Sequence, residues 1–310
     1  MHQIYTAVFE PGFFASSQAH VAAIVGGLVA IVSAVTGVFT VMRGQSFGGH
    51  ALGDVSAAGG SAALLIGLSP VAGFVGLGIA GAAVMDMIGV RRLRGRDLAT
   101  GIVLGTAIGL SALFLYLTST QGATTGAVQQ ILFGSIFTAP SGSIPVTIAL
   151  GVVALAALAF VGRPLLLMTV SPDIAAARGV PVRLVGLAYM LALAVSVGLS
   201  SLAIGAILST ALLIGPAATA LRVTRRVATA LGLACLFGVA ATWIGILLAY
   251  DSYYWGTSRE GLPVSFFIVA VVFLGYLASG LPVVRVSAGR RDNADPGQAA
   301  RAAEREELAA

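Results

Sequence analysis

The chain contains no lysine, and its 17 basic residues are all arginines. The GxxxxGK[ST] loop that binds nucleotide phosphates needs a lysine, so the chain does not hydrolyse nucleotide by itself. An HExxH zinc motif is also absent. The single cysteine, Cys235, lies in an apolar run, and this count excludes an internal disulfide and a cysteine-based metal cluster.

Charge is scarce as well. Only 9% of the 310 residues are charged, whereas a soluble domain carries about 25%. Hydrophobic residues make up 58% of the chain and its mean hydropathy is +0.99, which predicts an all-α, polytopic membrane helix bundle. The net charge of +5 does not indicate a nucleic-acid partner, because the arginines lie in short loops between apolar segments. The N-terminus lacks the pattern of a cleaved signal peptide.

A membrane-spanning helix needs about 20 mostly apolar residues. Nine segments meet this expectation: about 20–42, 51–69, 71–90, 98–118, 144–162, 184–201, 203–221, 228–250 and 264–284. Residues 1–19 are then an extracytoplasmic segment at the membrane interface, and residues 20–285 form the transmembrane domain. Residues 286–310, polar and rich in alanine and charge, are expected to be a disordered cytoplasmic tail.

The arginines predict the orientation. If the N-terminus lies outside, every arginine except Arg259 falls on the cytoplasmic side, as positively charged loops do in membrane proteins. The C-terminus is then cytoplasmic. The pattern fits a multi-pass protein of the inner (cytoplasmic) membrane of a bacterium, surrounded by lipid.

Two sequence features predict how helices pack. Gly101, Gly105 and Gly109 share one helix face, and small residues at this spacing favour close helix contact inside the bundle. Gly215 and Pro216 lie inside the seventh segment and predict a kink. A helix break within the membrane requires protein or water around it, so Pro216 is expected to face away from lipid.

His50 and Asp54 are the most unusual polar residues near the spans. They are four residues apart and therefore share one helix face. Imidazole and carboxylate are ligands for zinc, iron and manganese. The residues alone leave three interpretations open, namely a transient metal contact, a structural hydrogen bond or a proton relay. Nearby glycines at 48, 49, 53, 59 and 60 are expected to keep space open around the pair.

Several segments together resemble one known family, the integral-membrane permeases of ABC importers for zinc, manganese and iron(II). The run "RGQSFGGHALGDVSAAGG" (43–60) is similar to the family's "GDALSHAxLPG" region. "GAILSTALLIGPAATA" (205–220) is similar to "GxLLVxALLIxPAATA", and "SPDIAAARGVPVR" (171–183) to an acidic-start "DxExAxxxGV" loop. These motifs occur in the family's order across about residues 20–285.

The resemblance implies a homodimer around a central path, a separate cytoplasmic ATPase that uses ATP, and an extracytoplasmic protein that delivers the metal. The loop near 171–180 would be a short coupling helix that docks in the ATPase through Asp173, Arg178 and Gly179. His50 and Asp54 would contact the ion in transit, and no cofactor would be bound permanently. The family motif has the aspartate first, whereas here His50 holds that place and Asp54 the place of the histidine.

The expected function is therefore that of a non-enzymatic permease subunit of a metal-ion importer. The alternative is a proton-coupled secondary transporter with His50 and Asp54 as a relay. An intramembrane enzyme is disfavoured because a second polar cluster is missing. A permease for a larger metal chelate is disfavoured because the motifs resemble those of the ion branch.

Overall fold

The computed structural model describes residues 13, 16–88, 96–120, 126–134, 136, 144–253 and 261–281. Within these ranges every regular element longer than a turn is an α-helix. In chain order they are α2 (Ser17–Met42), α3 (Ser46–Leu65), α4 (Pro70–Ile88), α5 (Arg96–Thr120), α6 (Ala127–Phe133), α7 (Ile144–Val170), α8 (Pro172–Ala177), α9 (Val182–Ile204), α10 (Ala206–Val223), α11 (Val227–Ser252) and α12 (Val264–Ser279).

Each of the nine expected spans corresponds to one long helix. Seven of these helices, α2, α4, α5, α7, α9, α10 and α11, are long and apolar enough to cross a membrane. α12 is a shorter apolar helix, and α3, which is richer in polar and glycine residues, is not among the seven. The expected all-α membrane bundle is confirmed. Most of the expected interfacial segment and the whole of the expected tail, residues 286–310, lie outside the described residues.

Several expected boundaries were wrong, among them the ends at 69 and 284, which lie at Leu65 and Ser279. The segment expected to begin at residue 51 begins at Ser46, so that His50 lies inside α3 and not before it. The polar and glycine-rich residues of this run lower its hydropathy without preventing a helix. α7 continues past its expected end at 162, through Pro164, to Val170. The turn expected between 201 and 203 lies at Gly205, directly after Ile204.

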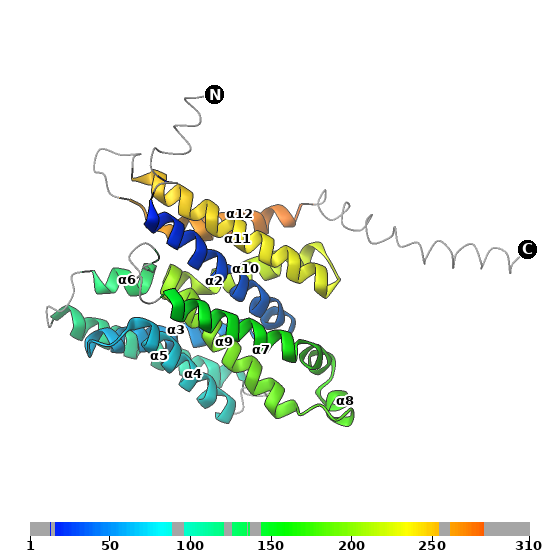
Figure 1. The fold of residues 1–310 in the computed structure, drawn as a ribbon. Helices are drawn as coiled ribbons and strands as arrows, with labels where there is room; N and C mark the ends of the chain where they lie inside the picture. Colours follow the sequence, from blue (N-terminus) through cyan, green and yellow to red (C-terminus); the bar gives the residue numbers. More distant parts are fainter. Residues whose placement is uncertain are drawn as a thin grey trace, which may run out of the picture.

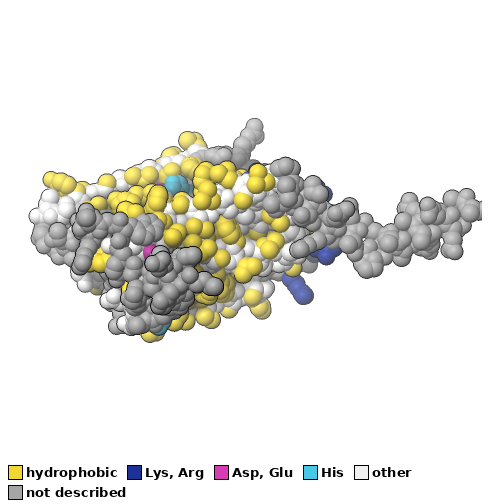
Figure 2. Space-filling model, turned by 90° about the horizontal axis from the view of Figure 1, so that it is seen from above, with side chains coloured by type: hydrophobic (Ala, Val, Ile, Leu, Met, Phe, Trp, Pro, Cys, Tyr) yellow, Lys and Arg dark blue, Asp and Glu magenta, His cyan; other side chains and the backbone are white. Residues whose placement is uncertain are grey.

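The helices lie side by side in a bundle, with α8 at one end and α6 at the other (Figure 1). α2 and α9 are the most buried of the apolar helices, whereas α5 and α7 expose most of their surface. α3 packs between α4 and α5 and also contacts α9 and α10. Hydrophobic side chains cover much of the described surface in Figure 2, as expected for a surface that faces lipid.

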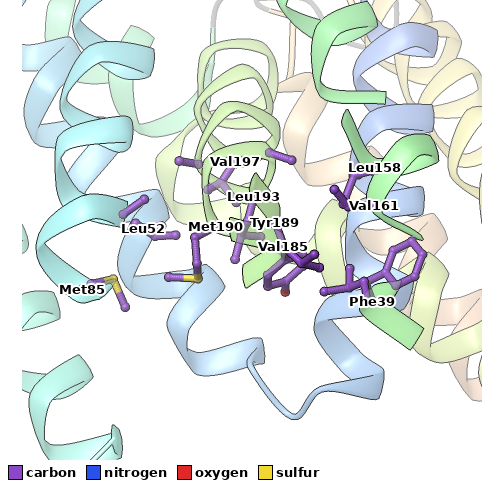
Figure 3. Packing of buried hydrophobic residues seen from close by; sticks show 14 of the residues in the cluster. Phe39, Leu52, Met85, Leu158, Val161, Val185, Tyr189, Met190, Leu193 and Val197 are labelled. Carbon is purple, nitrogen blue, oxygen red and sulfur yellow. The ribbon is translucent and has the colours of Figure 1, made fainter. Parts of the chain in front are cut away.

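One cluster of buried side chains joins six of the long helices, α10 among them through Leu213; part of it is drawn in Figure 3. α9 lies at its centre and contributes Val185, Tyr189, Met190, Leu193 and Val197. Phe39 of α2, Leu52 of α3, Met85 of α4, and Leu158 and Val161 of α7 pack around them. α3 is therefore fixed against α9 on the side opposite to its more exposed residues.

The glycine face of α5 does not pack as expected. Among the described residues, no atom of another helix lies within 4 Å of the position that a Cβ would take at Gly101, Gly105 or Gly109. The expectation that this face contacts another helix of the same chain was therefore wrong. Spacing shows that a face is smooth, but it does not show which surface covers that face.

Candidate metal-ion contact

The turn before α3 is held by the neighbouring helices. Gly44 has a φ of 61°, a conformation that glycine adopts without steric cost, and the Gln45 N–H donates to the Thr40 carbonyl at 2.9 Å. The Thr40 hydroxyl also hydrogen-bonds with the hydroxyl of Tyr189 at 2.9 Å. The Arg43 guanidinium lies 5.1 Å from the centre of the Tyr189 ring. These contacts tie the start of α3 to α2 and α9.

His50 and Asp54 lie one turn apart on α3. The imidazole Nε2 of His50 is 3.8 Å from Oδ2 of Asp54. The two side chains are 38% and 14% exposed, so the pair lies at the surface of the single chain and is not enclosed by it. No group of three or more histidine, cysteine, aspartate or glutamate side chains is found in the described ranges, so one chain offers two such ligands here.

The other nitrogen of the His50 ring contacts a different helix. Its Nδ1 is 2.8 Å from the Thr210 hydroxyl, on the second turn of α10. α10 is set in place by Gly205, which separates it from α9 and has a φ of 88°. A Cβ at Gly205 would collide with the Leu132 carbonyl oxygen, so the end of α6 packs directly on this break. Glycine is required there both by φ and by space.

The glycines around the pair do not keep space open, and that expectation was wrong. A Cβ at Gly49 would lie 2.9 Å from Leu213, and one at Gly53 would lie 3.2 Å from Val197. Gly60 packs on the Phe74 ring, Gly59 contacts the backbone of α4 and a Cβ at Gly48 would lie 3.8 Å from Met85. These glycines allow α9, α10 and α4 to approach α3 closely.

The Gly215–Pro216 site lies inside the protein, as expected. Pro216 is buried, and a Cβ at Gly238 of α11 would lie 3.6 Å from its ring. Gly215 packs so closely on Val272 of α12 that a Cβ would collide with it. The residues from 206 to 223 are all helical, so a bend at Pro216 stays a prediction.

A short helix occupies the loop expected to couple to an ATPase. Asp173 lies in the first turn of α8, where a carboxylate favours the helix dipole. The hydroxyl of Ser171 accepts from the Ile174 N–H at 3.3 Å and caps the helix. At the other end Gly179, with a φ of 79°, donates to the Ala176 carbonyl, and the next amide donates to that of Ala175. This is the Schellman ending of a helix.

The exposed face of α8 includes three neighbouring features. Asp173, Ile174 and Arg178 are exposed, with Ile174 at 51%, whereas Ala175 is fully buried against the bundle. The helix is thus fixed on one side and presents an apolar side chain between an acid and a base on the other. In Figure 1 it projects at the end of the bundle beyond α7.

Comparison with protein families identifies this architecture. A model of the ABC 3 transport family matches residues 17–279. The chain belongs to this family. The family expected from the three motifs is therefore confirmed.

Curated proteins resemble the chain over most of their length. The manganese transport system membrane protein MntC of Halalkalibacterium halodurans is 33% identical over 227 residues, which cover 72% of this chain and 76% of MntC. The high-affinity zinc uptake system membrane protein ZnuB of Haemophilus influenzae is 26% identical over 241 residues, 74% of this chain and 88% of ZnuB.

The fold of this family member also matches a solved structure. A chain of PsaBC from Streptococcus pneumoniae in complex with Fab superimposes with a TM-score of 0.75 at 23% identity, and the match covers 91% of this chain and 96% of that one. At this identity the likeness concerns the fold. The chain is thus a multi-pass membrane protein of the ABC 3 transport family.

Two residues of these sites were not predicted from the sequence, Ser171 and Thr210. Ser171 precedes Pro172 and Asp173, which is a typical start of a helix and a signal that could have been used. Thr210 carries a weaker signal, since it is one of two adjacent hydroxyl residues in an apolar run. Its partner His50 is 160 residues away, and no local pattern indicates that contact.

Proposed function

We propose that this chain is the permease subunit of an ABC importer that moves a divalent transition-metal ion, manganese or zinc, into the cell. The observation that carries the proposal is the His50–Asp54 pair, two metal-ligand types on one face of α3 in an ABC 3 transport protein. The names of MntC and ZnuB support these two ions. Iron, expected from the motifs, has no comparable support.

The geometry suits a weak and reversible contact. Zinc bonds to histidine nitrogen and carboxylate oxygen at about 2.1 Å, so one ion can bridge Nε2 and Oδ2 at their separation of 3.8 Å. Two ligands from one helix do not enclose an ion. This arrangement favours transit over tight binding.

The exposure of the pair supports a second copy of the chain at this surface. An ionised aspartate at the centre of a bilayer costs roughly 2.5–3.5 kcal/mol even on the lenient insertion scale, so Asp54 is not expected to face lipid. A twofold axis beside α3 places two imidazoles and two carboxylates together, because symmetric interfaces present the same patch twice. A homodimer therefore covers the pair and completes the ligand set.

Energy comes from a separate ATP-binding subunit in the cytoplasm, which docks on α8. The exposed Asp173, Ile174 and Arg178 offer this subunit a small amphipathic face, and Gly179 ends the helix sharply. This assignment places α8 in the cytoplasm, the N-terminus outside and the C-terminus inside, in the inner membrane of a bacterium. An extracytoplasmic metal-binding protein delivers the ion. The proton-coupled alternative has no support from the family match.

Uptake of radioactive manganese and zinc by the permease with its ATPase tests the proposal. His50→Ala and Asp54→Ala should each lower uptake by at least 10–100-fold, since even the loss of a group that only hydrogen-bonds a metal ligand has an effect of this size. Complex formation with the ATPase should be unchanged. His20→Ala, which alters an exposed histidine at the start of α2, is the matched control and should transport normally. Normal uptake by both His50→Ala and Asp54→Ala would overturn the site.

A further inference from the structure

The contact between His50 and Thr210 differs from the other hydroxyl contacts of α10. Ser209 donates to the Ala206 carbonyl at 2.9 Å, and Thr219 donates to the Gly215 carbonyl at 2.8 Å. These are local bonds to the same helix, which is the usual choice of a threonine or serine in an apolar helix. The Thr210 hydroxyl instead points across to α3 and lies 2.8 Å from Nδ1 of His50.

The two nitrogens of His50 therefore have different neighbours. Nδ1 meets a hydroxyl group of another helix, and Nε2 faces the Asp54 carboxylate at 3.8 Å. A neutral imidazole carries a hydrogen on only one of its two nitrogens. The hydrogen-bond partner of one nitrogen therefore decides whether the second nitrogen has a free lone pair for a metal ion. Asp54 attracts a hydrogen to Nε2, whereas a hydroxyl that accepts at Nδ1 holds the hydrogen there.

We propose that Thr210 is a positioning residue for ion transport. Its hydroxyl accepts the Nδ1–H of His50, fixes the plane of the ring and leaves the Nε2 lone pair directed at the ion beside Asp54. The inference rests on the proposed function, because it assigns a role within the same site. Metal-bound histidines commonly donate their second N–H in this way, and the partner tunes the affinity of the site.

The role predicts a specific failure when the hydroxyl is removed. Without an acceptor at Nδ1, the ring hydrogen moves to Nε2, where the Asp54 carboxylate attracts it. The Nε2 lone pair is then no longer available to bind the ion. The ring is also free to rotate. The ion then binds more weakly, whereas the helices keep their packing because the side-chain volume is unchanged.

Three substitutions separate this role from simple packing. Thr210→Val keeps the shape but removes the hydroxyl, and Thr210→Ser keeps the hydroxyl but removes the methyl group. Thr210→Val should raise the KM for manganese or zinc uptake about 10–100-fold with little change in maximal rate, and Thr210→Ser should stay near wild type. Thr219→Val, a similarly half-buried position of the same helix, is the matched control and should behave as wild type.

The KM values of Thr210→Val and Thr210→Ser distinguish a positioning role of the hydroxyl from a packing role of the side chain. A packing role predicts the reverse order, with the valine variant tolerated and the serine variant impaired, and this result would overturn the proposal. A wild-type KM for Thr210→Val would overturn it as well. If Thr210→Val fails to assemble, Thr210→Ala takes its place as the variant without a hydroxyl and is compared with Thr210→Ser. Equal metal uptake by Thr210→Ala and Thr210→Ser would contradict the positioning role.

A spectroscopic measurement tests the ring directly. The chain has only three histidines, so 15N-histidine labelling with His50→Gln as a reference identifies the His50 signals. At alkaline pH and without metal, the wild type should carry its ring hydrogen on Nδ1, and Thr210→Val should shift it toward Nε2. Unchanged signals in Thr210→Val would refute the inference.

The proposed function and this inference fail in different ways. If His50→Ala transports normally, the metal contact itself is wrong, whatever Thr210 does. If His50→Ala is inactive, and Thr210→Val shows wild-type uptake and wild-type 15N signals of His50, the metal contact stands and only the role of Thr210 is rejected.

Discussion

Gly59 of α3 and Gly73 of α4 pack backbone against backbone. A Cβ at either residue would collide with the carbonyl oxygen of the other, so the two helices cross at their closest approach. Without a hydrophobic driving force between helices in lipid, such close packing is a main source of association. The crossing lies on the side of α3 that carries no metal-ligand candidate, and it fixes the rotation that presents His50 and Asp54 outward.

This crossing gives the first prediction. Gly59→Ala and Gly73→Ala should each destabilise the solubilised protein by about 1–3 kcal/mol, the usual cost of overpacking a close contact. Gly76→Ala is the matched control, because nothing lies within 4 Å of its Cβ position on α4. The measurement is the unfolding temperature in detergent, and an equal loss in the Gly76 variant would contradict the explanation.

The second prediction concerns the end of α8. Gly179 has a φ of 79° but free space around its Cβ position, so a substitution there costs backbone strain alone. Gly179→Val should add about 1–2 kcal/mol of backbone strain and unravel the last turn of α8. Metal-stimulated ATP hydrolysis by the complex should fall, whereas Gly179→Asn, which tolerates this conformation, should retain most of it.

Coupling that is equally strong in the valine and asparagine variants would show that the ending of α8 does not matter for the ATPase. The same assay on a permease without the ATPase subunit gives the background rate.

The third prediction concerns the start of α8. The hydroxyl of Ser171 caps the helix at the Ile174 N–H, and loss of such a cap costs about 1 kcal/mol. Ser171→Ala should therefore weaken ATPase coupling, and Ser171→Asp, an equally good cap, should restore it. Metal uptake at saturating ATP is the measurement. Reduced metal uptake in both Ser171→Ala and Ser171→Asp would indicate that Ser171 contacts the ATPase directly instead of capping α8.

The fold was largely predictable because nine apolar runs are separated by arginine-bearing or turn-forming residues. The start of α3 was not, since His50 and its glycines reduce apolarity while α4, α9 and α10 supply the packing that keeps the segment helical. Hydropathy records the average environment of a helix and gives no information about a polar face that another surface covers.

The candidate site was only partly predictable. His50 and Asp54 were evident because the spacing of four places them on one face. Thr210 was not, because its contact depends on how α10 packs on α3. The glycines near the pair and those at 101, 105 and 109 illustrate the same limit, since a small residue permits close contact but does not specify a partner.

The last prediction exchanges the two ligands. His50→Asp combined with Asp54→His restores the residue order of the family motif and keeps one imidazole and one carboxylate on the same face of α3. The imidazole then lies one turn, about 5.4 Å, farther along the helix and away from the Thr210 hydroxyl. We expect uptake above that of His50→Ala, with a KM raised about 10–100-fold, as in Thr210→Val. A wild-type KM would show that neither the order nor Thr210 matters, because the ligand set alone would suffice. Uptake as low as in His50→Ala would show that the imidazole is needed at position 50 itself.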